Sequence, residues 1–316
     1  MFNALVQCSG GLVLFLWGLQ KIKNDFQQLV NYKVQRLISL LTWNFIVAII
    51  TGIMMTVVIQ SSSAAIIIII SLVDLKLLNF RQAVGVVVGT NIGTTVTVQL
   101  ISFDFTNYLG VIFSSAVFFY LIYYVSKMNW SKYLGQILIS FSSLLWGLEL
   151  LSSSLSGLGN SSWFITFMNY LSTWPYIGLL GGLIITAVVQ SSSAVTGLVV
   201  ALAKQKLIIL EVALAIALGS NVGTCITAFL ASMGSTREAK LTAWAHLYFN
   251  LIGVVLFSPL LPLFTHLLQQ FSFDLSRQIA NAHTIFNFST AIVIFIARDK
   301  FITGIYKVHY QSRKEV

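Results

Sequence analysis

Charged side chains are scarce in this sequence. Only 9% of its 316 residues are Asp, Glu, Lys or Arg, whereas 57% are hydrophobic and the mean hydropathy is +0.88. A soluble domain carries roughly 25% charged residues. The chain has too little charge to cover a water-facing surface, so its composition indicates an all-α polytopic membrane protein.

Cysteine is scarce as well, and Cys8 and Cys225 are too few for a disulfide framework or a cysteine metal site. The net charge of +9 does not imply a nucleic-acid partner, because basic residues of membrane proteins collect in cytoplasmic loops. The first apolar stretch is not a signal peptide, since Lys21 and Lys23 follow it instead of preceding it. We interpret it as a retained span with the N-terminus outside.

What is present is an internal repeat of polar motifs. The run "VVIQSSSA" ends at Ala64 and "AVVQSSSA" at Ala194, and "GTNIGTTVT" begins at Gly89 while "GSNVGTCIT" begins at Gly219, both 130 residues apart. Between residues 52 and 98 the two copies share 17 of 47 residues without a gap. The identities concentrate on Gly, Ser, Thr, Asn and Gln, which burial in lipid alone would not select.

The apolar segments fall into two length classes. A helical span needs about 20 residues, and seven segments fit: 5–20, 82–101, 109–125, 134–155, 212–231, 242–264 and 279–297. Segments 42–73 and 174–203 are too long for one span and too short for two. We expect each to form a re-entrant hairpin of two half-helices of about 15 residues, with the polar cluster at its tip and a serine capping the second arm.

The basic residues support this topology. If the hairpins return to their starting side, 15 Lys and Arg share one face and only Lys204, Lys206 and Arg277 lie on the other. If each hairpin crosses instead, the division is a weaker eleven against seven. Each repeat then has three crossings and one hairpin, which inverts the second copy. We predict a first repeat over 1–128, an inverted second repeat over 129–264, and a final span with a short cytoplasmic tail over 265–316.

In such an inverted repeat the two tips are expected to meet and form one binding site. The candidate residues are neutral hydrogen-bonding side chains from the tips and from the following helices. They are Gln60, Ser61, Ser62, Ser63, Thr90, Asn91, Thr94, Thr95, Gln190, Ser191, Ser192, Ser193, Ser220, Asn221 and Thr224.

No Lys or Arg lies in the hairpin arms or in the two glycine-containing motifs. Burying a bare anion there would cost tens of kcal/mol on a Born estimate, so an anion site without basic residues implies a co-bound cation. We predict a sodium site made by Gln60, Ser61, Ser62, Gln190, Ser191, Ser192 and neighbouring backbone carbonyls, and no other cofactor. The glycines, including Gly93 and Gly223, would permit either an unwound turn or close helix contact.

Three further residues remain open. His246 and His283 lie in the similar phrases "AHLYFN" and "AHTIFN", where helix–helix hydrogen bonding is favoured over gating or proton sensing. Glu149 lies near the outer end of its span, and it is either a functional membrane acid or an interfacial residue.

The paired "QSSSA" motifs, the "GTNIGTT" and "GSNVGTC" runs and the "AHxxFN" phrases resemble the type II sodium–phosphate cotransporter family, over nearly the whole chain. This resemblance implies sodium-driven transport of inorganic phosphate by alternating access, with both QSSS hairpins forming the substrate and sodium site. Two features depart from the family: we expect no PhoU-like domain, which some bacterial relatives carry, and the segment over 157–170 is short where animal members have a large outer loop. The size and minimal loops suggest a bacterial inner-membrane member.

Two alternatives stay open. The solute could be another small anion, such as arsenate, sulfate or a carboxylate. An intramembrane serine hydrolase is disfavoured because no histidine is placed by spacing beside either serine triplet. We therefore expect a transporter and not an enzyme, in contact with phosphate, sodium and lipid, with its C-terminus in the cytoplasm. A homodimer is a candidate assembly.

Overall fold

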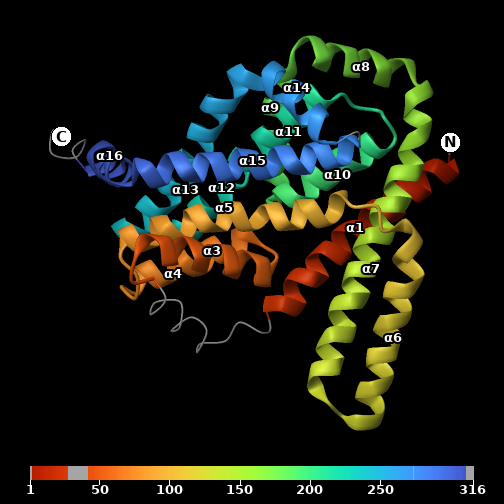
Figure 1. Cartoon of the computed structure of the whole chain (residues 1–316), viewed down its shortest axis with the longest axis horizontal. Coiled ribbons are helices and arrows are strands. Elements are labelled where there is room, and N and C mark those ends of the chain that lie inside the picture. Colours follow the sequence, from red (N-terminus) through yellow and green to blue (C-terminus); the bar gives the residue numbers. More distant parts are fainter. Residues whose placement is uncertain (1, 28–41, 273, 311–316) are drawn as a thin grey trace.

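A computed structural model of the chain describes residues 2–27, 42–272 and 274–310 (Figure 1). Every regular element in these residues is a helix, which confirms the all-α prediction. The elements are α1 (Phe2–Gln27), α3 (Phe45–Ile59), α4 (Ser62–Asp74), α5 (Phe80–Ser102), η1 (Thr106–Tyr108), α6 (Leu109–Ser126), α7 (Asn129–Leu155), η2 (Ser156–Asn160), α8 (Ser162–Thr173), α9 (Pro175–Val189), α10 (Ser192–Lys204), α11 (Leu210–Gly223), α12 (Cys225–Ser232), α13 (Arg237–Phe257), η3 (Ser258–Leu260), α14 (Leu261–Phe271), α15 (Leu275–Ile296) and α16 (Arg298–Tyr310).

Six helical segments of the described chain are long and apolar enough to cross a membrane, which confirms a polytopic membrane protein. They are Phe80–Ser102, Thr106–Ser126, Asn129–Asn160, Leu210–Ser232, Arg237–Phe271 and Leu275–Ile296. A seventh is counted if α8 and α9, which meet at a bend of 108°, are taken as one broken span. The predicted span over 5–20 lies in α1, which is not among the six.

Both predicted hairpins are present, and both bend at the polar cluster. The arms α3 and α4 have 15 and 13 residues, and α9 and α10 have the same two lengths. Gln60 and Gln190 end the first arms in the left-handed region, with φ of 54° and 58°. Ser61 and Ser191 then cap the second arms by accepting hydrogen bonds from the backbone N–H groups of Ala64 and Ala194. The expected serine caps are therefore confirmed.

Polar contacts show that the two copies are inverted. At one end of the body, Asp74 at the end of α4 accepts from the N–H of Thr236, which follows α12, at 2.6 Å. The first hairpin thus opens where the second repeat's broken helix ends. At the other end, Lys204 at the end of α10 lies 3.5 Å from Glu149. The hairpins enter from opposite ends, as the basic residues predicted; Lys33, Arg36, Arg313 and Lys314 lie outside the described residues.

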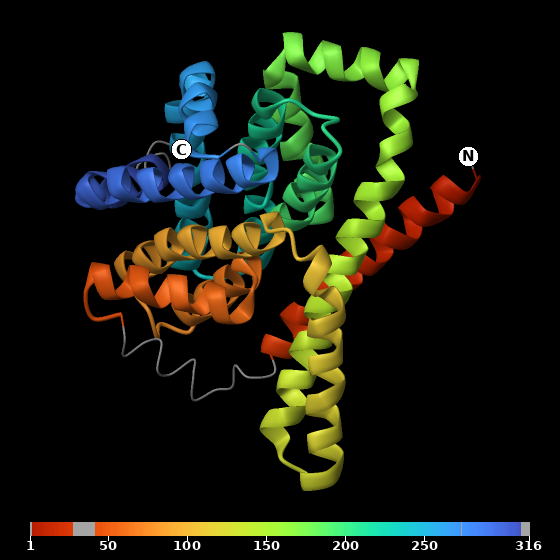
Figure 2. The same ribbon diagram turned by 45° about the vertical axis from the view of Figure 1, so that its right-hand side comes forward.

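The repeat-equivalent helices α1 and α7 cross each other at a close, antiparallel contact (Figure 2). A side chain at Gly18 would meet the backbone of Leu144, and one at Gly147 would meet the backbone of Phe15. These glycines stand in the "FLWGL" and "LLWGL" runs, so the two copies of one motif pack on each other. This reciprocal contact is what a pseudo-twofold axis between the repeats requires.

The third crossings of the repeats are not arranged alike. Helix α13 packs in the body against α4, α5, α12 and α15, whereas α6 packs along α7, and this pair projects from the rest of the chain (Figures 1 and 2). Only 6% of the apolar window in α6 is buried within the chain. The identity between the two copies ends before α6, and the two copies are no longer structurally equivalent from that point on.

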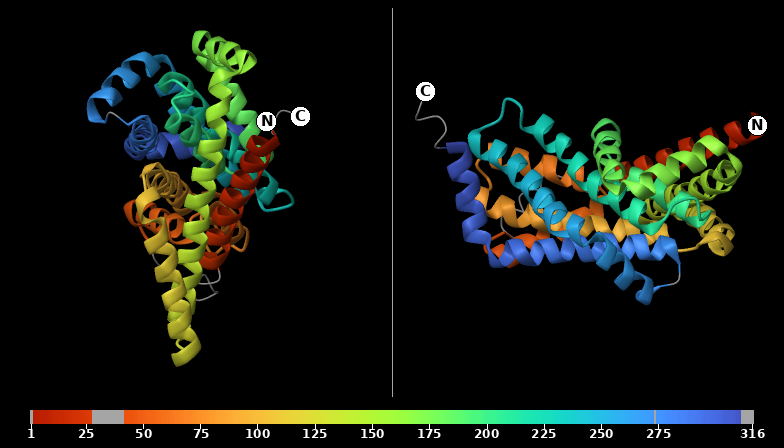
Figure 3. Two further views of the ribbon diagram at one scale, coloured as in Figure 1. Left: turned by 90° about the vertical axis from the view of Figure 1, so that its right-hand side faces the viewer. Right: turned by 90° about the horizontal axis from the view of Figure 1, so that it is seen from above.

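Two boundaries differ from the predictions. The span expected over 242–264 lies within the longer candidate span Arg237–Phe271, in which α13 ends at Phe257 and η3 and α14 follow at Pro259 and Pro262. Residues 157–170 are not a plain outer loop, because most of them form η2 and α8. At the C-terminal end, α16 turns sharply away from α15 (Figure 3).

Candidate binding site at the hairpin tips

The first tip is tied to its own repeat. The Gln60 Nε2 group donates to the carbonyl of Val57 at 2.7 Å, and the Gln60 Oε1 atom accepts from the Thr97 hydroxyl of α5 at 2.9 Å. Ser61 is buried, while Ser62 and Ser63 are half-buried. The side chain of Gln60 therefore fixes the tip of the first hairpin against α5.

The second tip lacks that bond. Thr227 is the repeat counterpart of Thr97, but its hydroxyl donates to the Thr224 carbonyl of its own helix at 2.8 Å. Gln190 is exposed, whereas Ser192 and Ser193 are buried and Ser191 is half-buried. The two tips thus have the same backbone and different side-chain anchoring.

Glycines seat each first arm directly on the following helix. A side chain at Gly89 would meet the backbone of Ile49 and Ile53 in α3, and one at Gly219 would meet the backbone of Leu179 and Leu183 in α9. Close helix contact is therefore their role at both positions. The structure shows no unwound turn at either motif: α5 runs unbroken through the first copy, and in the second copy Thr224, between α11 and α12, keeps right-handed helical dihedrals and donates its N–H to the Ser220 carbonyl at 3.1 Å.

The hydroxyls of the second motif donate to their own helices. Thr90, Thr94 and Thr95 donate to carbonyls three or four residues earlier, and Ser220 and Thr224 do the same in the other copy. All five are buried. Because their protons are engaged, these hydroxyls offer oxygen lone pairs, which suit a cation better than an anion.

Three buried threonines that sequence reasoning missed do have free hydroxyls. Thr56 and Thr186 occupy equivalent places in the last turns of the two first arms, and Thr196 lies in α10; none of the three hydroxyls has a hydrogen-bond partner. Thr56 and Thr186 are an identical pair of the repeat, which was the available signal. They would supply donors to an anion near the tips.

The two motif asparagines are held by the "AHxxFN" phrases. Asn250 in α13 donates to the Asn91 Oδ1 atom at 3.3 Å, and the Nε2 atom of His283 in α15 lies 3.0 Å from the Asn221 Oδ1 atom. The preferred interpretation, helix–helix hydrogen bonding, therefore agrees with His283. For His246 the structure shows its carbonyl accepting from Asn250 and Cys225.

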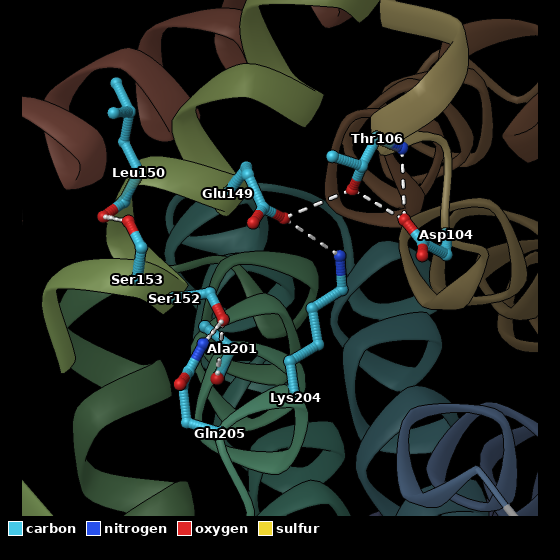
Figure 4. A network of polar contacts seen from close by, with 9 residues as sticks. All are labelled: Asp104, Thr106, Glu149, Leu150, Ser152, Ser153, Ala201, Lys204 and Gln205. Carbon is cyan, nitrogen blue, oxygen red and sulfur yellow. Dashed lines mark hydrogen bonds and ion pairs between the residues drawn. The ribbon is translucent and has the colours of Figure 1, made fainter. Parts of the chain in front are cut away.

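The C-terminal end of α10, the second arm of the second hairpin, is held by a polar network (Figure 4). Lys204 pairs with Glu149 of α7, and Gln205 donates to Ser152 at 3.2 Å. Next to them the hydroxyl and backbone N–H of Thr106 donate to Asp104 and lower the pKa of that carboxyl below its usual value. Glu149 thus forms an ion pair near the C-terminal end of α7.

Helix α4 of the first copy packs on α12 of the second, and α10 of the second copy packs on α5 of the first. Since α12 corresponds to the end of α5, these two contacts are equivalent under the repeat. It brings each second arm, with its capping serine at the start, against the other repeat. That both tips line one pocket remains a prediction.

Two re-entrant hairpins with polar tips, entering an all-helical membrane body from opposite ends, define the architecture of inverted-repeat membrane transporters. The family model "Na+/Pi-cotransporter" matches residues 14–153 and again 144–272. The chain therefore belongs to the Na+/Pi-cotransporter family, with one match for each repeat.

Named relatives agree with this assignment. The "Uncharacterized protein YqeW" of Bacillus subtilis is 31% identical over 290 residues, which cover 92% of this chain and 93% of that protein. The "Putative inorganic phosphate export protein YjbB" of Escherichia coli is 22% identical over 92% of this chain, which spans 53% of that protein. The "Sodium-dependent phosphate transport protein 2A" of Rattus norvegicus is 41% identical over 95 residues, 28% of this chain and 15% of that protein. No solved structure matches.

Proposed function

We propose that the protein moves inorganic phosphate across a bacterial inner membrane in a sodium-coupled, alternating-access cycle. The observation that carries the proposal is the pair of inverted hairpins whose tips present neutral hydrogen-bonding groups in a member of the Na+/Pi-cotransporter family. Relatives named for sodium-dependent phosphate transport and for phosphate export support phosphate as the solute. Their names differ in direction, so net uptake or export is set by the gradients in the test.

The hydrogen-bonding groups of the site fall into two sets, one suited to phosphate and one suited to sodium. Free hydroxyls of Thr56, Thr186 and Thr196 suit the phosphate oxygens, as do the serines of the tips. The engaged hydroxyls of the second motif, the tip glutamine oxygens and the backbone carbonyls freed at the left-handed tips suit sodium. In the described part of the chain no group of three or more His, Cys, Asp or Glu side chains is placed to hold a metal.

A neutral site explains why the two ions would move together. Phosphate carries one or two negative charges near neutral pH, and the hairpin tips offer it no Lys or Arg, since Lys204 lies at the far end of α10 and pairs with Glu149. Sodium bound beside it offsets that charge and lowers the desolvation penalty. Each ion then stabilises the other in the site, which is the thermodynamic basis of coupling.

The test is phosphate flux into proteoliposomes with and without a sodium gradient. We expect flux that follows the sodium gradient and falls when Ser62 or Ser192 is replaced by Leu. Normal insertion of both variants, checked by their yield and gel-filtration profile, is the control. Equal phosphate flux with sodium and with choline would refute sodium coupling. Normal flux in both variants would refute the proposed binding site at the tips.

Competition by unlabelled arsenate, sulfate or a carboxylate against labelled phosphate identifies the solute. A transporter for another anion would show stronger competition by that anion than by phosphate itself. The described residues give the serine-hydrolase alternative no supporting contact. His283 bonds Asn221 and Asn287, and His246 bonds Asn250 and Cys225, so neither histidine is bonded to a tip serine.

A further inference from the structure

A pocket at the outer end of the body lies between α8 and the turn that joins α10 to α11. Its polar members are Asn169, Ser172 and Lys206, and its apolar lining includes Ile209 just before α11 and Val212 in its first turn. No Asp or Glu lines it. The lining therefore carries one positive charge and offers an amide as a second donor, while the Ser172 hydroxyl already donates to the Asn169 carbonyl at 2.7 Å.

Lys206 sits in a backbone conformation that favours glycine. Its φ is 57°, and it occupies the position just past α10, where its N–H donates to the Ala203 carbonyl and the next N–H donates to Leu202. This is a Schellman motif, in which glycine is the usual residue because other side chains are strained there. Lys76, its repeat counterpart, has a φ of 59° and the same pair of bonds. A lysine therefore occupies a strained left-handed position just after the second arm of each hairpin.

Of the three basic residues predicted at this end, Lys204, Lys206 and Arg277, only Lys206 has no ion pair or ring contact among the described residues. Lys204 pairs with Glu149 there, and Arg277 donates to Ser102 and stacks on Phe103, with its guanidinium 3.9 Å from the ring centre. For Lys206 the described part of the chain shows neither an ion pair nor a stacked ring.

Exposed aromatic residues around the pocket favour a position where lipid headgroups meet water. Helix α8 bends by 108° from the hairpin arm α9, and it lies across the outer end of the body (Figure 2). Trp163 and Tyr170 of α8 and Trp174 and Tyr176 beside it are more than half exposed. Exposed Trp and Tyr of this kind mark the membrane interface. Phosphate groups are available at this level from lipid headgroups and from solution.

We infer that the pocket under α8 is a second anion site that binds a phosphate group through the Lys206 ammonium and the Asn169 amide. Lys206 supplies a fixed positive charge, so this site binds its anion without sodium, unlike the neutral hairpin tips. The lysine contacts the anion directly, and the left-handed turn keeps its backbone in the lining of the pocket. The inference stands independently of phosphate transport, because either source of phosphate satisfies it.

Lys206→Gly separates a binding role from a structural one. Glycine relieves the strain of the turn and removes the charge, so the variant should gain thermal stability while it loses anion binding. Lys76→Gly is the matched control, because it makes the same backbone change at the opposite end. Lys206→Gln and Asn169→Ala remove the two donors singly.

Binding of labelled inorganic phosphate to delipidated protein in detergent is measured with sodium and with choline. The wild type is expected to keep a sodium-independent component whose affinity falls roughly ten- to hundredfold in Lys206→Gly, as for loss of a charge-assisted hydrogen bond. Native mass spectrometry in a mixture of phosphatidylglycerol and phosphatidylcholine is the second arm. If the lipid headgroup is the occupant, Lys206→Gly loses a phosphatidylglycerol adduct that the wild type and Lys76→Gly retain.

Loss of binding in either arm supports the site and assigns its source. If Lys206→Gly is more stable and binds both phosphate and phosphatidylglycerol like the wild type, the inference is overturned. A protein that transports no phosphate in the flux assay but shows either loss would refute the proposed function and leave this site standing.

Discussion

Replacing Gly219 by Ala should disturb the second hairpin through its backbone. A Cβ atom at this position would meet the carbonyl oxygen of Leu179 and lie 3.0 Å from the N atom of Leu183, both backbone atoms of α9. A backbone cannot turn aside as a flexible side chain can, so the arm must move. Forcing an extra carbon into a packed contact costs about 1–3 kcal/mol.

The same protein offers a control in which the added carbon has space. Gly181 lies in α9 itself, and nothing lies within 4 Å of an added Cβ. Gly181→Ala should therefore show only the helix-propensity gain of about 1 kcal/mol. Gly219→Ala receives the same gain and loses more to the contact, so the two changes should shift stability in opposite directions.

Thermal unfolding in detergent, followed by circular dichroism or by loss of the gel-filtration peak, measures this difference. Gly89→Ala in the first repeat meets the backbone of Ile49 and lies 2.9 Å from the Ile53 N atom, and it should behave like Gly219→Ala. Both variants should also raise the half-saturation concentration for phosphate, because each displaces an arm that carries a tip. If Gly219→Ala and Gly181→Ala change stability alike, the close arm–helix contact is wrong.

Two other predictions test topology and the outer network. Single cysteines at the exposed positions Leu77 and Ile209, in a chain without its two native cysteines, should react with an impermeant reagent from opposite sides of the membrane; labelling from one side only would contradict the inverted hairpins. Lys204→Gln should raise labelling of the position-209 cysteine severalfold, because it removes the ion pair to Glu149 that helps hold the end of α10 (Figure 4); an unchanged rate would mean that this partly exposed pair contributes little.

The hairpins and their inversion could be predicted because four neighbouring polar residues in apolar sequence leave few other structures. Gln60 to Ser63 need a break in the helix and a polar surrounding, and the repetition 130 residues later sets the symmetry. The serine caps follow from the same residues by local chemistry. The prediction relied on composition and spacing, which act over short distances along the chain.

The contacts between distant helices could not be predicted in the same way. Nothing in the sequence pairs Asn250 with Asn91 or His283 with Asn221, because such partners depend on how α13 and α15 pack. The position of α6 away from the body could not be predicted either, because its apolar sequence would suit contact with lipid or with another helix. Comparison with the large loop of animal family members identifies residues 157–170 as a short loop, and that comparison does not predict helix α8 within them.

The unequal tips lead to a prediction about the transport cycle. An inverted repeat can face the two sides alternately if each copy adopts, in turn, the conformation of the other. In the present state Gln60 is bonded to Thr97, whereas Gln190 is exposed and Thr227 bonds its own helix. In the opposite state we therefore expect Gln190 to bond Thr227 and Gln60 to be released.

Cysteine pairs measure this exchange directly in a chain without its native cysteines. A pair at positions 60 and 97 should cross-link readily in the present state, and a pair at 190 and 227 only in the opposite one. Reversing the sodium gradient across proteoliposomes should raise one yield and lower the other, because a gradient biases the populations of the two states. The exposed positions 77 and 209 provide a non-linking control pair. If both yields rise and fall together, the two tips change at the same time. The difference between the tips in this structure would then not correspond to two states of the transport cycle.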